Sequence, residues 1–164
     1  MRRLVRIYDR LVTALAVVAG LTIMLAMMFV VVDVSGRFFA SAPIAWINEY
    51  TEHLMVFIPF FGMAWLVRRA EGHVRIDLVV NALSPRAQGW LAAWVALLCT
   101  GTCAFAAYYA GLETIKNFDR GIETIGNYPA PKWPLIGAVA LGLGLCAVEF
   151  ARVLHARLRG LFPN

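Results

Sequence analysis

Charge is scarce in this sequence. Only 15% of its 164 residues are Asp, Glu, Lys or Arg, whereas a soluble globular domain carries about a quarter. Hydrophobic residues make up 61% of the chain and occur in long blocks rather than in short amphipathic stripes. The scarcity of charge therefore excludes an ordinary soluble domain and predicts an integral membrane protein.

Residues that build metal and redox sites are also few. The chain has three histidines and three cysteines, and all the cysteines lie inside apolar blocks. Two of them, Cys99 and Cys103, are four residues apart, but two thiols alone make a poor metal site. We therefore expect no metal site. Internal repeats and low-complexity linkers are lacking too, so residues 1–164 are expected to form a single integral-membrane domain.

Catalytic motifs are missing as well. The sequence contains no nucleophile–base set, no phosphate-binding loop and no pair of broken helices of the kind that builds transporter sites. We expect a chain that is not an enzyme and binds no cofactor itself. The net charge of +5 could indicate nucleic-acid binding, but the arginines flank apolar blocks and form no continuous basic face. No nucleic-acid partner is therefore expected.

Four apolar blocks have the length that a membrane span requires, about 17–25 residues. The predicted spans are residues 11–33, 50–67, 90–112 and 134–154. The first follows a basic stretch, like a signal peptide, but it exceeds the roughly 7–15 apolar residues of such a signal and is expected to be retained. The predicted fold class is an all-α membrane protein with four transmembrane helices in contact with lipid.

Positive charge predicts the orientation of these spans. Most Lys and Arg residues lie in the N-terminal stretch, in the second connection and at the C-terminal end, and fewer lie in the first and third connections. Positive residues accumulate on the cytoplasmic side of membrane proteins. Both termini and the second connection are therefore predicted to be cytoplasmic.

Several residues predict where helices begin, bend and end. Ser84 followed by Pro85 fits an N-cap and a first helical position. Gly72 can end the second helix in a left-handed turn, and Pro59 should kink that helix. The tryptophan and tyrosine within residues 41–50 suit the membrane surface, which predicts a short interfacial helix before the second span.

The second span begins with three ionisable residues, Glu49, Glu52 and His53. Carboxylates are favoured near a helix N-terminus by its dipole, but ionisable residues inside a membrane usually have a partner. We favour an interfacial role for Glu49 and leave Glu52 open between these two interpretations. His53 enters from the side opposite the other two histidines, which argues against a bis-histidine haem but leaves open a haem shared with a partner chain.

The remaining polar and small residues favour packing roles. Glu149 and Arg152 are three residues apart and predict a local ion pair. Small residues recur every four positions at Ala138, Gly142 and Cys146, a spacing that lets helices approach closely. The segment 113–134 is long and of mixed charge, and we interpret it as an ordered outer surface.

The order of several short motifs resembles the small membrane subunit (DctQ-like small permease) of tripartite ATP-independent periplasmic, or TRAP, transporters. After the first span, the similar stretches are Gly36-Arg37-Phe38, then Pro43 and the Trp-x-x-Glu of Trp46 to Glu49, then Phe61-Gly62 before an arginine-bearing turn, then Gly72-His73-Val74-Arg75-Ile76-Asp77, and finally Pro131, Trp133, Pro134 and Gly137. The sequence departs from the family pattern in one place, since Trp133 and Pro134 are adjacent where the family usually has intervening residues.

The resemblance implies a division of labour among three proteins. A large multi-span permease would carry the substrate and sodium sites, and a periplasmic binding protein would deliver an organic acid. This chain would scaffold the permease in the bacterial inner membrane, with no substrate site of its own. Its motif residues would be structural or would contact the other subunits: Arg37, Trp46, Glu49, Glu52, Gly62, Gly72, His73, Asp77, Trp133 and Pro134. Of these, Gly72, His73 and Asp77 are expected to fix the cytoplasmic turn.

Two alternatives stay open from the residues themselves. One is a membrane anchor of a redox complex that binds haem or quinone. The other is a small self-sufficient transporter, working as a homodimer with Glu52 as its coupling carboxylate.

Overall fold

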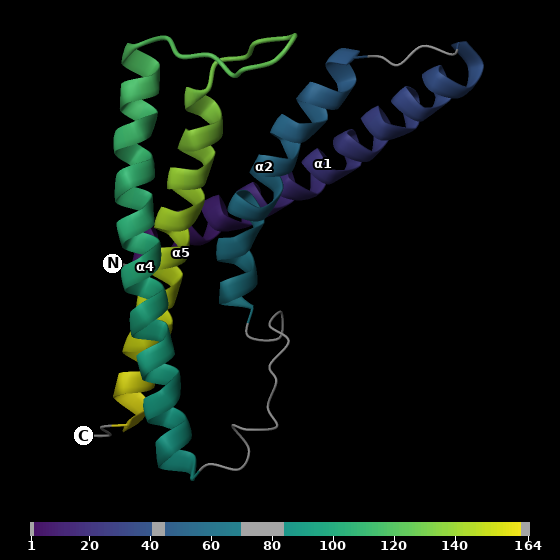
Figure 1. Cartoon of the computed structure of the whole chain (residues 1–164). Coiled ribbons are helices and arrows are strands. Elements are labelled where there is room, and N and C mark those ends of the chain that lie inside the picture. The colour runs from purple at the N-terminus through teal and green to yellow at the C-terminus, as the bar shows by residue number, and fades with distance from the viewer. Residues whose placement is uncertain (1, 41–44, 70–83, 162–164) are drawn as a thin grey trace.

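The computed structural model describes residues 2–40, 45–69 and 84–161. They form four helices, shown in Figure 1: α1 (Arg2–Ala40), α2 (Ala45–Arg68), α4 (Pro85–Asp119) and α5 (Trp133–Leu161). All four are long and apolar enough to cross a membrane. The predicted all-α class with four membrane helices is therefore confirmed, and each predicted span falls within one helix.

Two of the helices are longer than a bilayer is thick. α1 has 39 residues and α4 has 35, about 58 and 52 Å at 1.5 Å per residue, against roughly 30 Å of hydrocarbon. α4 continues to Asp119, beyond the predicted end at residue 112, because local contacts support its last turns. Lys116 pairs with Glu113 at 3.1 Å, and the Asn117 side chain donates to the Glu113 carbonyl at 2.6 Å. Residues 113–119, the first part of the segment 113–134 expected to follow the helix, therefore belong to α4.

The helix boundaries can be compared with the starts and ends predicted from the sequence. The Ser84 side chain accepts a hydrogen bond from the Ala87 amide at 3.4 Å, with Pro85 at the first helical position, so the predicted cap is confirmed. Residues 45–50 form the first turns of a continuous α2, and residues 41–44 lie outside the described residues. Gly72, His73 and Asp77 also lie outside them, so the turn expected there stays a prediction.

The helices pack as two pairs, α1 with α2 and α4 with α5, and the pairs are joined where α2 meets α5. Figure 1 shows α4 and α5 side by side, while α1 and α2 lean away from them. Figure 1 also shows α2 changing direction midway. α2 contains Pro59, which has no N–H for the preceding turn, and this accounts for the predicted kink.

The joint between the pairs depends on Gly142 of α5. A Cβ added there would lie closest to the Phe60 carbonyl oxygen, and 2.7 Å from both the carbonyl carbon and the Cβ of Phe60. Ala138 and Cys146, one turn to either side, are buried. The small-residue face predicted on α5 is thus a packing face, where the backbones of α2 and α5 approach too closely for any side chain.

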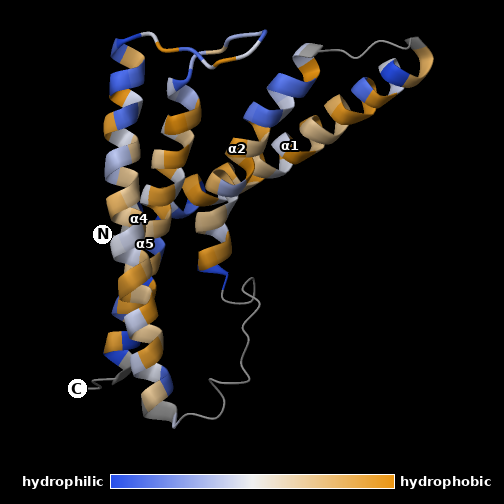
Figure 2. Cartoon of the chain, in the orientation of Figure 1, coloured by the Kyte–Doolittle hydropathy of each residue, from blue (hydrophilic) through white to orange (hydrophobic). Residues whose placement is uncertain are grey.

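The buried core is small. Val12, Ala64 and Cys146 form one cluster within it, and only 11% of the residues in the most apolar windows of α1 and α4 are buried. Figure 2 shows hydrophobic residues along the lengths of the helices and hydrophilic ones gathered towards their ends and in the α4–α5 loop. Most of the apolar surface of α1 and α4 is therefore left for lipid or for another protein.

Candidate functional site

Polar side chains tie the helices together at two places. One is at the loop end of the molecule, where α2 begins and α4 is connected to α5. The other lies partway along α5, where α1 begins and α2 ends. Since the predicted polar residues fall at or near these places, we describe each in turn.

At the loop end, Glu49 of α2 holds the α4–α5 loop. Its carboxylate oxygens accept hydrogen bonds from the backbone N–H groups of Asn127 at 2.9 Å and Tyr128 at 2.8 Å. A carboxylate accepting from two amides makes charge-assisted bonds, which are stronger than bonds between neutral groups. We call this contact the Glu49 anchor. Glu49 therefore contacts its own chain, 78 and 79 residues further on.

Gly126 permits the close approach of that carboxylate. A Cβ at this position would lie 2.8 Å from Oε2 and 3.1 Å from Cδ of Glu49. The absence of a side chain thus leaves room for the carboxylate directly beside the two amides that it binds.

The loop itself is ordered by internal hydrogen bonds, as predicted. After α4, Gly121 turns the chain with a φ of 58°, a left-handed value that suits glycine. The Thr124 amide then donates to the Ala130 carbonyl at 2.8 Å, and the Lys132 amide to the Ile122 carbonyl at 3.0 Å. The loop is thus a short hairpin that Glu49 attaches to α2.

The other ionisable residues near Glu49 have different surroundings. Glu52 is exposed, and its side chain accepts only a long contact of 3.4 Å from Asn48 among the described residues. His53 is partly buried beside the Tyr50 ring, with centroids 6.3 Å apart. Its Nδ1 atom is enclosed and lacks a hydrogen-bond partner within the described part of the chain. The two glutamates expected on one side of the helix therefore make separate contacts.

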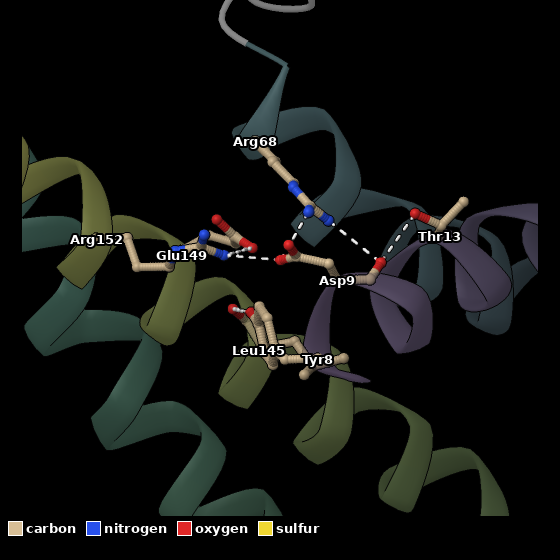
Figure 3. Close-up of polar contacts among 7 residues, drawn as sticks. All are labelled: Tyr8, Asp9, Thr13, Arg68, Leu145, Glu149 and Arg152. Atoms are coloured by element: carbon tan, nitrogen blue, oxygen red, sulfur yellow. Dashed lines mark hydrogen bonds and ion pairs between the residues drawn. The ribbon is translucent and has the colours of Figure 1, made fainter. Parts of the chain in front are cut away.

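Where α1 begins and α2 ends, Asp9 of α1 links three helices, as Figure 3 shows. Its carboxylate lies 2.6 Å from the Arg68 guanidinium of α2 and 3.2 Å from that of Arg152 of α5. Arg152 also pairs with Glu149 at 3.2 Å, which confirms the predicted local pair. The hydroxyl of Tyr8 donates to the Leu145 carbonyl at 3.1 Å. We call Tyr8, Asp9, Arg68, Glu149 and Arg152 the Asp9 cluster.

The Asp9 cluster is partly removed from water. The Glu149 side chain is only 4% exposed, and those of Arg68 and Asp9 are 28% and 31% exposed. Partly buried charges are costly unless they are paired, so removing one partner leaves another uncompensated. The cluster therefore fixes the beginning of α1 against both α2 and α5.

The remaining predicted motif residues are distributed along the helices. Arg37 pairs with Asp33 of the same helix at 2.6 Å, and the Trp46 ring lies edge-on to Phe29 of α1 at 5.9 Å. Gly62 faces α1, where an added Cβ would lie 3.9 Å from the Ala19 Cβ, an ordinary contact. Trp133 and Pro134 begin α5, and the Trp133 ring packs against Phe118 of α4 at 5.4 Å. Trp46, Gly62 and Trp133 therefore contact neighbouring helices, whereas Arg37 pairs within its own helix.

Metal and haem sites find little support in the geometry. Among the described residues, no group of three or more His, Cys, Asp or Glu side chains is placed to hold a metal ion. His53 lies in the first half of α2 and His155 in the last turns of α5. Because Figure 1 shows α2 and α5 running in the same direction, these two histidines lie towards opposite ends.

Sequence reasoning missed the contacts made by Asp9, Arg68 and Tyr8. The sequence predicts only a topological role for Arg68 and only a local pair with Glu149 for Arg152. One signal was available: Asp9 is the only acidic residue in the first 32 positions and lies among arginines. An isolated carboxylate at the start of a span is expected to have a partner.

Comparison with known proteins gives the family. The model for "Tripartite ATP-independent periplasmic transporters, DctQ component" matches residues 26–160. The chain is also similar to the C4-dicarboxylate TRAP transporter small permease protein of Pseudomonas aeruginosa (strain PAO1), with 29% identity over 123 residues. That alignment covers 70% of this chain and 55% of the relative, so the chain spans little more than half of the relative's length. The four helices and the family match over most of the sequence lead to one conclusion: this chain belongs to the DctQ component family of tripartite ATP-independent periplasmic transporters.

Proposed function

We propose that this chain is the small membrane subunit of a TRAP-type secondary transporter and scaffolds a large multi-span permease in the bacterial inner membrane. In this proposal the permease takes up an organic acid with sodium, and a periplasmic binding protein delivers that acid. This chain then contributes neither a substrate site nor a sodium site.

One observation carries the proposal: the polar groups of this chain serve its own assembly, while its apolar faces are left open. The Glu49 anchor and the Asp9 cluster hold helices and loop together. By contrast, Phe39 of α1 is 84% exposed and Phe105 of α4 is 66% exposed. Apolar patches of this extent mark contacts with lipid or protein. Family membership favours a protein partner for part of this surface.

The proposed orientation keeps both termini and the connection between α2 and α4 in the cytoplasm, following the distribution of positive charge. The α4–α5 loop and the Glu49 anchor then face the periplasm. Trp46 and Tyr50, at the start of α2, then lie at the periplasmic surface of the inner membrane, because such aromatic residues are favoured at membrane surfaces. Exposed Ile125 and Tyr128 on the loop are available to the periplasmic binding protein.

The test is a purification of the tagged chain in mild detergent from its native membranes, followed by reconstitution. We expect a much larger multi-span protein to copurify in a fixed ratio. With the binding protein and a sodium gradient supplied, we expect uptake of an organic acid in liposomes only when both membrane proteins are present. Uptake by this chain alone, lost in Glu52→Gln, would support the homodimeric transporter instead. A haem absorption band in the purified material would support the redox anchor.

A further inference from the structure

An apolar groove of about 540 Å³ runs along the contact between α1 and α2. Small and aliphatic side chains line most of it, including Ala16, Val17, Gly20 and Ile23 of α1 and Ile58 and Met63 of α2. Both helices are able to cross a membrane, so the groove opens towards hydrocarbon.

At one end the groove continues into a basic hollow of about 460 Å³. The two share Thr13 and Val17, and the hollow is also lined by Arg6, Arg10 and Arg68. Arg6, Arg10, Thr13 and Val17 recur every three or four residues, so they lie along one face of α1. The surface is therefore apolar along most of its length and cationic at one end only.

The charges in the hollow are unequally compensated. Its one carboxylate, Asp9, is already bound by Arg68 at 2.6 Å and by Arg152 at 3.2 Å. The Arg6 and Arg10 side chains are exposed and make no hydrogen bond or ion pair with any described residue. The Arg69 guanidinium lines the groove and lies 4.4 Å from the centre of the Trp65 ring. Two arginines thus remain free to bind an anion.

We propose that this surface binds one anionic phospholipid, with its phosphate at Arg6 and Arg10 and an acyl chain in the groove between α1 and α2. The distribution of charge favours this occupant. A phospholipid is charged at one end and apolar along the rest, which is the pattern of the surface itself. Basic pockets between membrane helices at the bilayer surface bind anionic headgroups.

The site goes beyond the scaffold role and does not rest on it, because α1 and α2 alone form the surface. Phosphatidylglycerol and cardiolipin have the required phosphate charge, whereas phosphatidylcholine is zwitterionic. The preference between these headgroups therefore reports on the arginines, and binding of any diacyl lipid reports on the groove.

The experiment is native mass spectrometry of the full chain in mild detergent, titrated in turn with phosphatidylglycerol and with phosphatidylcholine. We expect one bound lipid, with phosphatidylglycerol preferred. In the double variant Arg6→Gln/Arg10→Gln, the ratio of phosphatidylglycerol to phosphatidylcholine affinity should fall roughly tenfold, since each arginine near a bilayer surface attracts anionic lipid. The matched control Arg157→Gln/Arg159→Gln removes the same charge from exposed residues of α5 and should keep it.

A second pair of variants tests the groove. Gly20→Leu places a side chain into it, and Gly101→Leu places the same side chain on exposed α4; an added Cβ at either position meets nothing within 4 Å. We expect only Gly20→Leu to weaken binding of both lipids. Three results would overturn the proposal. The unmodified chain could bind the two lipids equally, or a control variant could lose as much binding as the variant it controls for. The third is a lipid that binds the free chain but is expelled from the purified complex by a helix of its partner.

Discussion

Replacing Gly142 by alanine should loosen the joint between the two helix pairs. The added Cβ would lie 2.7 Å from the carbonyl carbon and the Cβ of Phe60, whereas ordinary contacts begin near 3.4 Å. The nearest atom is a backbone carbonyl oxygen, which cannot rotate away as the end of a flexible side chain can. α2 and α5 must therefore separate by more than about 0.7 Å, the difference between those two distances, because that difference clears only the two carbon atoms and the oxygen is closer still.

The cost of that separation can be estimated. Overpacking a close contact costs about 1–3 kcal/mol, whereas alanine gains about 0.5–1 kcal/mol over glycine inside a helix. A glycine-to-alanine variant elsewhere in the same helix gains the same helix propensity, so comparing the two variants removes that contribution. Gly144 is such a control, because its added Cβ would lie 4.0 Å from the Ala107 Cβ. Gly142→Ala should therefore be less stable than Gly144→Ala by about 1–3 kcal/mol.

The assay is thermal unfolding of each variant in mild detergent. Tryptophan fluorescence monitors unfolding, and size-exclusion chromatography measures how much monomer remains after heating. At roughly 2–4 °C per kcal/mol, Gly142→Ala should melt about 2–12 °C below Gly144→Ala. Gly62→Ala serves as a second control, since its Cβ would make an ordinary contact at 3.9 Å. If all three variants melt together, the close approach of α2 to α5 does not contribute to stability and the reasoning is wrong.

Three further predictions concern the polar anchors. Glu49→Gln should raise hydrogen exchange at the two loop amides it binds by about tenfold, as expected from weakening charge-assisted hydrogen bonds. Glu52→Gln is the control and should leave that exchange unchanged. Gly126→Ala should raise the same exchange, because its Cβ would lie 2.8 Å from the Glu49 carboxylate, and its effect should not add to that of Glu49→Gln; full additivity would contradict the shared contact. Arg68→Gln should lower the free energy of unfolding by about 1–2 kcal/mol, because it removes a partly buried ion pair. Replacing its exposed neighbour, in Arg69→Gln, should lower that free energy by less. Equal losses in the two variants would contradict a stabilising role for the Asp9 cluster.

Local features of this fold could be predicted from the sequence. The four spans follow from the length of the apolar blocks, and the start of α4 at Pro85 follows from the Ser84 cap. The pair between Glu149 and Arg152 spans three residues of one helix. In each case the interacting groups are neighbours along the chain, so helix geometry alone brings them together.

Contacts between distant segments could not be predicted in the same way. Glu49 binds amides 78 and 79 residues away, and Asp9 meets Arg152 across 143 residues. Helical periodicity shows which residues share a face, but apolar faces of similar character do not specify which helices pack together. The small-residue face of α5 was recognised from its spacing, yet its partner Phe60 emerged only from the packing of α2.

The pairing of helices that are adjacent in sequence has a consequence for biosynthesis. α1 packs mainly on α2, and α4 mainly on α5, so the first hairpin can form before α4 exists. Domains and hairpins near the N-terminus form first as the chain is made. The bond between Asp9 and Arg152 requires the last helix, so its closure marks the moment when newly inserted chain becomes a finished subunit. The joining of the two hairpins therefore follows the insertion of α5, through several late contacts that include the Asp9 cluster and the close approach of Gly142 to Phe60.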